Sequence, residues 1–389
     1  SSKALSDLGH EVDVFSGPPY PDLSASVKLI KIPSLGLYEK ESKFFDVQLS
    51  SLTDPINLFE WLSINSGGFP EPYTFGKRLK KVLSNDIDKY DIVHDNQSLC
   101  YELLDFQKQK PLVTTIHHPI SKDLNYQLQS TSDIFLKLLM RRWHSFLTMQ
   151  KFVAKKLNKI LVPSKSSIVD IREEFGVKEN KMERLMNGID RDVFYPDPKV
   201  KKISRRIVTV ASADVPLKGL DFLLQALFRL IKIYPDISLS IIGEQKKGGH
   251  TERLIDELNL KEHVNFFSNL SQGNLRKTYC EAEMAVIPSL YEGFGFAAIE
   301  AMACGVPIIS SSGGALPEVI KDCGIIIPPK DSKAIYNSVA HLFSSPDNAK
   351  KLANKALERV KERFSWEVVA KKLEEVYFTE IENFHHADD

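Results

Sequence analysis

Short apolar runs alternate with helical patterns along almost the whole chain. In the first half, runs that predict strands lie at 11–15, 27–32, 91–94, 111–117, 159–162 and 183–186. After a proline-bearing connection the pattern restarts, with strands predicted at 207–211, 238–242, 264–267, 284–287, 307–310 and 325–327. Buried parallel strands are short apolar runs, and their alternation with helices indicates βαβ units. Two such series predict an α/β protein with two tandem doubly wound domains.

The restart of the pattern also places the domain boundaries. We predict a first Rossmann-like domain over 1–191, a second over 192–364, and an amphipathic helix with a tail over 365–389. The opening "SSKALSDLGHEVDVFSG" is typical of the back half of a helix followed by a strand. We therefore expect the natural chain to start earlier. The first strand of the first domain would then be missing here, and the central position of its sheet vacant.

Composition is that of an ordinary globular protein. A length of 389 residues favours two domains. The chain has 51 Lys+Arg and 51 Asp+Glu, and this balance argues against a protein that binds nucleic acid through an excess of positive charge. Four scattered cysteines without a C-x-x-C pair favour reduced thiols. No apolar run approaches the roughly 18–20 residues that span a bilayer, and no signal peptide is visible. We expect a cytoplasmic protein.

The stretch "YEGFGFAAIEAMACGVP" at 291–307 places glycines and two acids, Glu292 and Glu300, at the start of a helix. Ligands of doubly wound domains lie beyond the carboxyl ends of the strands, and strand 284–287 ends just before this stretch. Glycine lets a ligand approach the backbone, and the first helical turn attracts phosphate. Carboxylates accept hydrogen bonds from sugar hydroxyls. The pattern therefore indicates a site for a phosphate-linked sugar, with a packed core helix and two solvated acids as the alternative.

Four segments together resemble the retaining family-4 glycosyltransferases, which have the GT-B fold. "EGFGFAAIEAMACGVPIISSSGGALPEVI" looks like the family signature, two glutamates separated by seven residues. "MNGIDRDVF" (186–194) resembles the end of the first domain, and "LKGLDFLLQAL" (217–227) resembles the donor-binding turn and helix. "RFSWEVVAKKLEEVY" (363–377) is similar to the closing helix, which in the family crosses back onto the first domain. The segments follow the family's order over nearly the whole chain.

The resemblance implies roles for individual residues on the donor side. Glu292 would contact the donor sugar near the reacting carbon, and Glu300 would hold the ribose of the nucleotide. Lys218 would neutralise the diphosphate leaving group. His117, in "TTIHHP", would reach the donor sugar from the first domain. The residues that would supply backbone near the donor phosphates and sugar are Phe294, Gly295 and Phe296.

One position departs from the family pattern. About six residues before the lysine the family usually has an arginine, where this chain has Ser212, and a serine cannot clamp a phosphate bidentately. Either Lys218 and the helix N-terminus suffice, with another basic residue nearby, or activity is weak or absent. The second case would make the chain a non-catalytic nucleotide-sugar binding or scaffold protein.

The combination of acids, lysine and histidine favours an active enzyme. We expect a retaining hexosyltransferase that uses a nucleotide-diphosphate sugar, with a UDP-sugar as the first choice, and a glycan, lipid or small-molecule hydroxyl as acceptor. Cell-envelope or polysaccharide biosynthesis is the setting that the resemblance implies. A phosphorylase of the pyridoxal type would need a Schiff-base lysine and a much longer chain, and an epimerase gives no reason for the spacing of the two glutamates.

We expect neither a metal nor a cofactor. The chain contains one D-x-D sequence, Asp86-Ile87-Asp88, but it precedes a strand and so lies at the wrong end of the sheet for the site. On the acceptor side, candidates are His94 and Asn96 at the end of strand 91–94, and His118 beside His117. A capped strand end is the alternative for His94.

Two segments of the first domain suggest further contacts. Residues 132–160 predict one basic amphipathic helix, with apolar residues at helical spacing and seven Lys/Arg against one Asp. Such helices can lie on anionic membranes, so peripheral membrane contact is one interpretation. An ordinary core helix with a solvated basic face is the other. The segment "INSGGFPEPYTF" (64–75) either shapes acceptor choice or is a plain connection.

Overall fold

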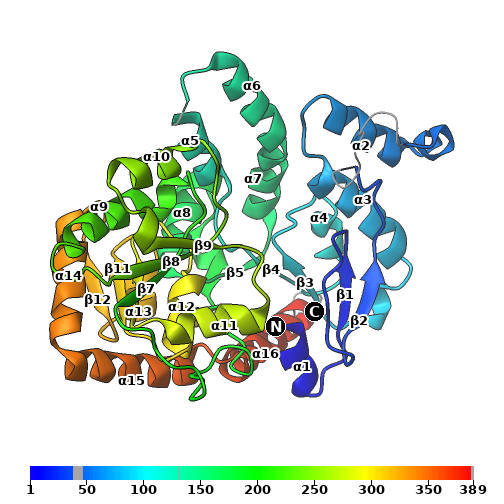
Figure 1. Ribbon diagram of the computed structural model, residues 1–389. Coiled ribbons are helices and arrows are strands. Elements are labelled where there is room, and N and C mark those ends of the chain that lie inside the picture. The colour runs from blue at the N-terminus through cyan, green and yellow to red at the C-terminus, as the bar shows by residue number, and fades with distance from the viewer. Residues whose placement is uncertain (38–46, 130, 387–389) are drawn as a thin grey trace. The chain divides into compact units, whose positions relative to one another are not determined.

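A computed structural model describes residues 1–37, 47–129 and 131–386 (Figure 1). The chain divides into two compact units. The first comprises Ser1–Pro163, Ser167–Leu185 and Ala370–Asp389, and the second comprises Ser164–Ser166 and Met186–Val369. The long segment of the second unit thus begins at Met186, where the sequence suggested 192. Both units contain parallel sheets whose strands alternate with helices, so the predicted α/β class with two Rossmann-like domains is confirmed.

The second unit contains one six-stranded parallel sheet in the order β12-β11-β10-β7-β8-β9. Its strands are β7 (Arg206–Val210), β8 (Ser238–Ile242), β9 (Val264–Phe267), β10 (Met284–Ile287), β11 (Ile308–Ser311) and β12 (Ile325–Ile327). Its helices are α9 (Leu220–Leu230), α10 (His250–Glu257), α11 (Gln272–Glu281), α12 (Phe296–Ala303), α13 (Leu316–Ile320), α14 (Ser332–Ser344) and α15 (Pro346–Arg363). The order reverses between β7 and β10, which makes their junction the topological switch point.

Two apolar cores cover the two faces of this sheet. One joins α9 and α14 to the strands through residues such as Leu223, Leu227 and Val339. The other joins α11, α12 and α13 to the opposite face through residues such as Met302 and Leu316. Because successive strand side chains point to opposite faces, Val208 belongs to one core and its neighbour Ile207 to the other.

The described residues of the first unit form two parallel sheets. β1 (Asp13–Ser16) pairs with β2 (Lys28–Lys31), and a separate sheet has the order β3-β4-β5-β6. Its strands are β3 (Val93–Asn96), β4 (Leu112–Thr115), β5 (Lys159–Val162) and β6 (Met182–Arg184). Its helices are α1 (Ser2–Asp7), α2 (Pro55–Asn65), α3 (Glu71–Leu83), α4 (Leu103–Phe106), α5 (Ser121–Gln129), α6 (Ile134–Trp143), α7 (Leu147–Lys156) and α8 (Lys165–Phe175). Within the described residues, no strand pairing joins β1–β2 to β3–β6.

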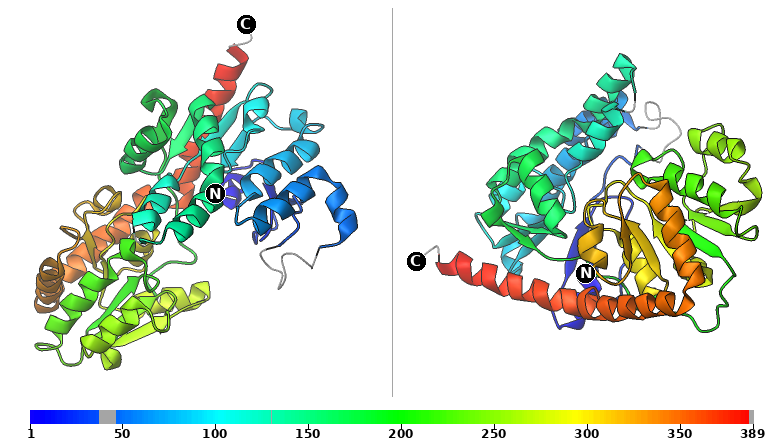
Figure 2. Two further views of the ribbon diagram at one scale, coloured as in Figure 1. Left: turned by 90° about the horizontal axis from the view of Figure 1, so that it is seen from above. Right: turned by 90° about the vertical axis from the view of Figure 1, so that its left-hand side faces the viewer.

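The boundary between the two units falls within the C-terminal helix α16 (Trp366–His386), between Val369 and Ala370. Helix α16 is the long red helix of Figure 2, and from Ala370 onward it belongs to the first unit. There Leu373 and Val376 pack with Leu5 of α1 and Val113 of β4. The helix extends through His385 and His386. None of the helices in the described ranges is long and apolar enough to cross a membrane.

The prediction of one helix over 132–160 was wrong. The segment forms α6, a short 3-10 turn η3 (His144–Phe146) and α7, and strand β5 already begins at Lys159. The two helices differ in packing, since Met149 and Val153 of α7 are fully buried whereas no residue of α6 is. The apolar residues at helical spacing therefore form a buried helix face only in the second half of the segment, in α7.

Candidate functional site

The two loops that leave the switch point of the second unit carry the predicted donor residues. Lys218 ends the 3-10 turn η5 (Pro216–Lys218) after β7, and Glu292 lies in the loop between β10 and α12. The backbone N–H of Leu290 donates to the carbonyl of Leu217 over 2.7 Å, which ties one loop to the other. The side chains of Lys218 and Glu292 are thereby held at the carboxyl ends of adjacent strands.

Glycines allow these loops to approach closely. Gly219 has a φ of +66°, and a Cβ at this position would collide with the carbonyl of Pro288. Gly314 has a φ of +61° and lies against the backbone of Glu292, whose carbonyl accepts the N–H of Ala315 over 2.8 Å. Backbone contacts thus join the loops after β7, β10 and β11, so the position of Glu292 does not depend on side-chain packing alone.

Lys218 and Glu292 form an ion pair. Lys218 Nζ lies 2.7 Å from Glu292 Oε1, and the hydroxyl of Ser289 donates to the same oxygen over 2.8 Å. Charge-assisted hydrogen bonds of this kind are short and directional. Both side chains keep some exposure, so the ammonium and the carboxylate remain accessible to a ligand at the switch point. Sequence reasoning missed Ser289, although its S-x-x-E spacing to Glu292 is a recognisable local pattern.

Glu300 lies on α12 and is bound by a buried tyrosine. The hydroxyl of Tyr279, on α11, donates to Glu300 Oε2 over 2.7 Å. Burial raises the pKa of Glu300, partly opposed by the hydrogen bond from Tyr279. Burial also raises the pKa of Tyr279, which keeps this hydroxyl a donor. No local sequence signal points to Tyr279, because the two residues lie on different helices.

The two aromatic residues at the start of α12 have different environments. Phe294 is buried in the core, its ring 5.3 Å from that of Phe296 and 6.0 Å from that of Phe364. Phe296, at the first position of α12, is 47% exposed. Gly295 precedes the helix with a φ of +100°. Only the backbone of Phe294 can therefore serve a ligand, whereas Phe296 can also offer its ring.

Ser212 lies in the exposed loop after β7. Its hydroxyl accepts the N–H of Glu244 at 3.5 Å, a long hydrogen bond. Two residues on, Asp214 accepts the N–H of Thr251 over 2.8 Å, and Lys246 Nζ approaches Asp214 Oδ2 at 3.7 Å. The backbone hydrogen bond from Thr251 lowers the pKa of Asp214. The loop after β8 therefore brings an exposed lysine to the side of the switch-point loop where Ser212 lies.

The first unit places His117 at the carboxyl end of β4. Its N–H donates to Gln97 Oε1 over 2.7 Å, and its Nε2 lies 2.8 Å from Asn96 Oδ1. The hydroxyl of Ser167 donates to its carbonyl over 3.1 Å. Burial, and the neighbouring His118, lower the pKa of His117. Gln97 is a positioning residue that the sequence did not single out, because its partner His117 follows a different strand.

The other two histidines make contacts within the first unit. His94 Nδ1 lies 2.5 Å from the hydroxyl of Tyr377 on α16, and its Nε2 lies 2.7 Å from Thr115 Oγ1. Burial lowers the pKa of His94 to about 4. With both ring nitrogens engaged, the contacts favour the alternative in which His94 is a packed strand residue. His118 Nε2 lies 2.9 Å from Asp123 Oδ2.

The acidic residues of the D-x-D sequence lie on the surface and pair with lysines. Asp86 lies 2.5 Å from Lys89 Nζ, and Asp88 lies 3.7 Å from Lys110 Nζ. Among the described residues, no group of three His, Cys, Asp or Glu side chains is arranged to hold a metal ion. The four cysteines are buried and unpaired within the described chain.

Comparison with known proteins identifies the family. Residues 2–193 match the model "Glycosyltransferase Family 4", and residues 195–359 match "Glycosyl transferases group 1". The chain is 40% identical to an MMP alpha-(1->4)-mannosyltransferase of Mycolicibacterium hassiacum, over 97% of this chain and 92% of the relative. It is 25% identical to D-inositol 3-phosphate glycosyltransferase 2 of Catenulispora acidiphila, over 98% and 88% of the two chains.

The solved structures agree on the fold. Sucrose-phosphate synthase from Thermosynechococcus elongatus superposes with a TM-score of 0.72 at 23% identity, covering 97% of this chain and 91% of that chain. The similarity of fold covers both units, and the sequence relationship spans nearly the whole chain. This protein therefore belongs to the family-4 glycosyltransferases and has the GT-B fold.

Proposed function

We propose that the protein transfers a hexose from a nucleotide-diphosphate sugar to the hydroxyl of a glycan, lipid or small molecule, with retention of configuration. The observation that carries this proposal is the Lys218–Glu292 pair at the switch point of the second unit. There an ammonium group can meet a diphosphate, and a carboxylate lies beside it to accept a hydroxyl of the donor sugar. Glu300, bound to Tyr279, is the group proposed to hold the ribose.

The proposed reaction breaks the bond between the anomeric carbon and the diphosphate and forms a bond to the acceptor oxygen. The acceptor proton passes to the leaving phosphate. Negative charge grows on the diphosphate as the bond breaks, so a preorganised ammonium at Lys218 lowers the barrier. The resemblance assigns His117, in the first unit, to the donor sugar. Because Lys218 is paired with Glu292 in the free protein, donor binding requires the ammonium to be shared with the phosphate.

Lys246 is the proposed second cation. Ser212 stands where the family usually has an arginine, and Lys246 reaches the same loop through Asp214. Its side chain is 69% exposed and so retains freedom to turn toward a phosphate. This supports catalysis over the alternative, a non-catalytic nucleotide-sugar binding or scaffold protein.

The sugar and the setting are also proposals. The 40% identical relative is named a mannosyltransferase, which makes mannose the first hexose to test. A UDP-sugar is the first donor choice, and a role in cell-envelope or polysaccharide biosynthesis in the cytoplasm fits a glycan or lipid acceptor. No cofactor and no metal are proposed.

We also propose reversible contact between α6 and an anionic membrane surface. Ile134 and Phe135 of this helix are 75% and 69% exposed, although both are large and apolar. Lys137 and Arg141 lie on the same helix and make no ion pair within the described residues. Apolar insertion and attraction to anionic headgroups would act together. Co-sedimentation with anionic vesicles at two salt concentrations tests the contact, and Phe135→Ser should weaken it while Leu49→Ser, also on an exposed apolar residue, should not.

A donor panel tests the proposed function. The full chain is incubated with radiolabelled UDP- and GDP-hexoses and a set of glycan and lipid acceptors, with and without EDTA. Transfer in the presence of EDTA, with an α-linked product, is the expected result. Tight nucleotide-sugar binding with neither transfer nor hydrolysis would instead establish the non-catalytic alternative.

A further inference from the structure

The first unit contains a cavity of about 320 Å³ at the carboxyl ends of its strands. Its wall includes Gly17 after β1, Ser34 after β2, Gln97 after β3 and Ile120 after β4. Ligands of doubly wound domains lie at this edge. The volume is at the lower end of the roughly 300–1,000 Å³ typical of small-molecule sites, so the cavity suits one ring-sized group.

Aromatic rings form much of the wall. Phe69 and Phe75 come from the segment 64–75, and Phe146 comes from η3. The rings of Phe69 and Phe146 meet edge to face with centroids 5.6 Å apart. Flat apolar walls with a few polar groups suit an amphipathic ring such as a pyranose, whose C–H faces are apolar and whose edge carries hydroxyls. The segment 64–75 is therefore more than a plain connection.

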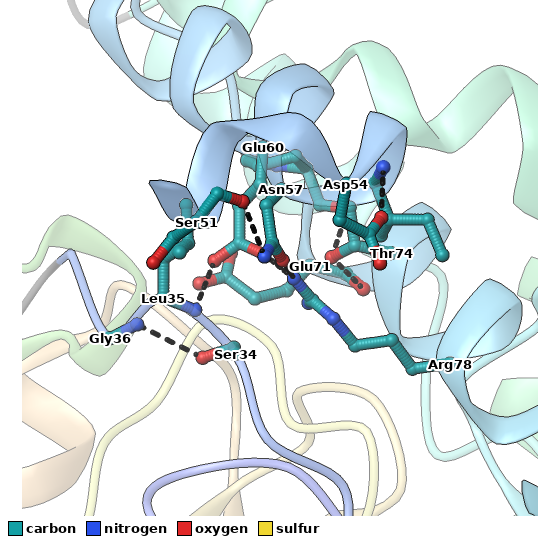
Figure 3. Close-up of polar contacts among 12 residues, drawn as sticks. Ser34, Leu35, Gly36, Ser51, Asp54, Asn57, Glu60, Glu71, Thr74 and Arg78 are labelled. Atoms are coloured by element: carbon teal, nitrogen blue, oxygen red, sulfur yellow. Dashed lines mark hydrogen bonds and ion pairs between the residues drawn. The ribbon is translucent and has the colours of Figure 1, made fainter. Parts of the chain in front are cut away.

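The charges in the wall do not suit an anion. Arg78 is the one basic residue among the described residues of the wall. Its guanidinium points toward Glu60 and Asn57 (Figure 3). Arg78 lies 2.5 Å from Glu60 Oε2 and 2.6 Å from Asn57 Oδ1, and Glu60 is fully buried. Glu71 also lines the cavity. A phosphate here would meet a cation that is already neutralised and a carboxylate of its own sign.

A buried amide provides an acceptor for a hydroxyl. Gln150 of α7 lines the cavity and is only 2% exposed. Its Nε2 donates to the carbonyl of Ser98 at 3.3 Å, while its Oε1 has no hydrogen-bond partner among the described residues. Buried polar groups are rarely left without a partner, so an O–H from a ligand would complete this one.

The cavity is also linked to the proposed catalytic histidine. Gln97 lines the cavity, accepts the N–H of His117 and donates to the carbonyl of His118 over 2.8 Å. A ring bound in the cavity therefore lies next to the strand end that carries His117.

We infer that this cavity binds one neutral pyranose residue of the acceptor, with Gln150 Oε1 accepting one of its hydroxyls, and that it excludes phosphorylated sugars. The inference rests on the proposed function and narrows its acceptor to a neutral glycan. It separates this chain from an enzyme that acts on a sugar or cyclitol phosphate.

Binding can be measured on the full chain without a donor. Saturation-transfer NMR would compare methyl α-D-mannoside, glucoside and galactoside with D-mannose 6-phosphate. We expect saturable binding of at least one methyl glycoside and none of the phosphate. Gln150→Leu should weaken glycoside binding about three- to tenfold, as expected for one neutral hydrogen bond. Gln109→Leu, at a surface glutamine bonded to the carbonyl of Asp105, is the matched control.

A second variant covers the case in which Gln150→Leu fails to fold. Ser34→Phe adds a ring to the cavity wall and should abolish glycoside binding while UDP binding is unchanged. Equal binding by both variants and the wild type, binding of no methyl glycoside, or binding of mannose 6-phosphate as tightly as the mannoside would overturn the inference. Glycoside binding without transfer from any donor would overturn the proposed function and leave the cavity assignment standing.

Discussion

The Lys218–Glu292 pair allows a quantitative prediction of how kcat changes when Lys218 is substituted. Lys218→Ala removes the ammonium that faces the proposed diphosphate and leaves Glu292 with the hydroxyl of Ser289 as its partner. A hydrogen bond to a charged group is worth about 1.5–3 kcal/mol. Each 1.36 kcal/mol in the barrier is a factor of ten in rate, so we expect kcat to fall about 10- to 150-fold.

The same variant should fold normally. The pair is partly solvent-exposed, and such pairs contribute at most about 1 kcal/mol to stability, which corresponds to a few degrees in the melting temperature of a unit of this size. The assay measures UDP release with saturating acceptor, and the affinity for UDP is measured separately by calorimetry. Lys218→Arg retains the charge and should recover part of the activity, and Lys333→Ala, at an exposed position on α14, is the surface control.

Two results would refute this reasoning. If Lys218→Ala retains a kcat within about twofold of the wild type while Lys246→Ala loses tenfold, the cation that serves the diphosphate is Lys246. If both variants turn over normally, no cation at the switch point stabilises the leaving group, and the roles carried over from the resemblance fail together.

Three further predictions test neighbouring residues. Because burial raises the pKa of Glu300, the folded protein binds more protons than the unfolded chain above pH 4.5, and the free energy of unfolding should fall as the pH rises from there. Glu300→Gln should therefore melt higher than the wild type at pH 7, by up to a few degrees. The same variant should bind UDP more weakly. Burial lowers the pKa of His94 to about 4, so on acidification the unfolded chain gains a proton below pH 6.5 before the folded protein does. The melting temperature should therefore fall as the pH is lowered from 6.5 to 4. This fall should be shallower in His94→Gln. Ser212→Arg adds a cation at the family's usual position and should tighten UDP binding up to about tenfold by calorimetry.

Much of the fold follows from local pattern. Short apolar runs predicted the twelve strands of the described residues, because buried parallel strands carry that pattern whatever their neighbours are. The local pattern could not predict contacts between residues that lie far apart in the sequence. Tyr279 reaches Glu300 and Gln97 reaches His117 only because separate elements pack together. The break between α6 and α7 was missed because helical spacing looks the same whether a face is covered or open.

The two units hold their sites in different ways, and this difference has a consequence for specificity. Around Glu292, backbone contacts leave no room for a side chain at Gly219 or Gly314, so substitution of either glycine would disturb the proposed donor site itself. Around the cavity of the first unit, the walls are side chains such as Phe69 and Gln150, contributed by separate elements. Substitution there can change the shape and polarity of the wall while the donor loops stay intact. Acceptor choice should therefore be alterable by point mutation in the first unit, with the donor and the chemistry at the switch point unchanged.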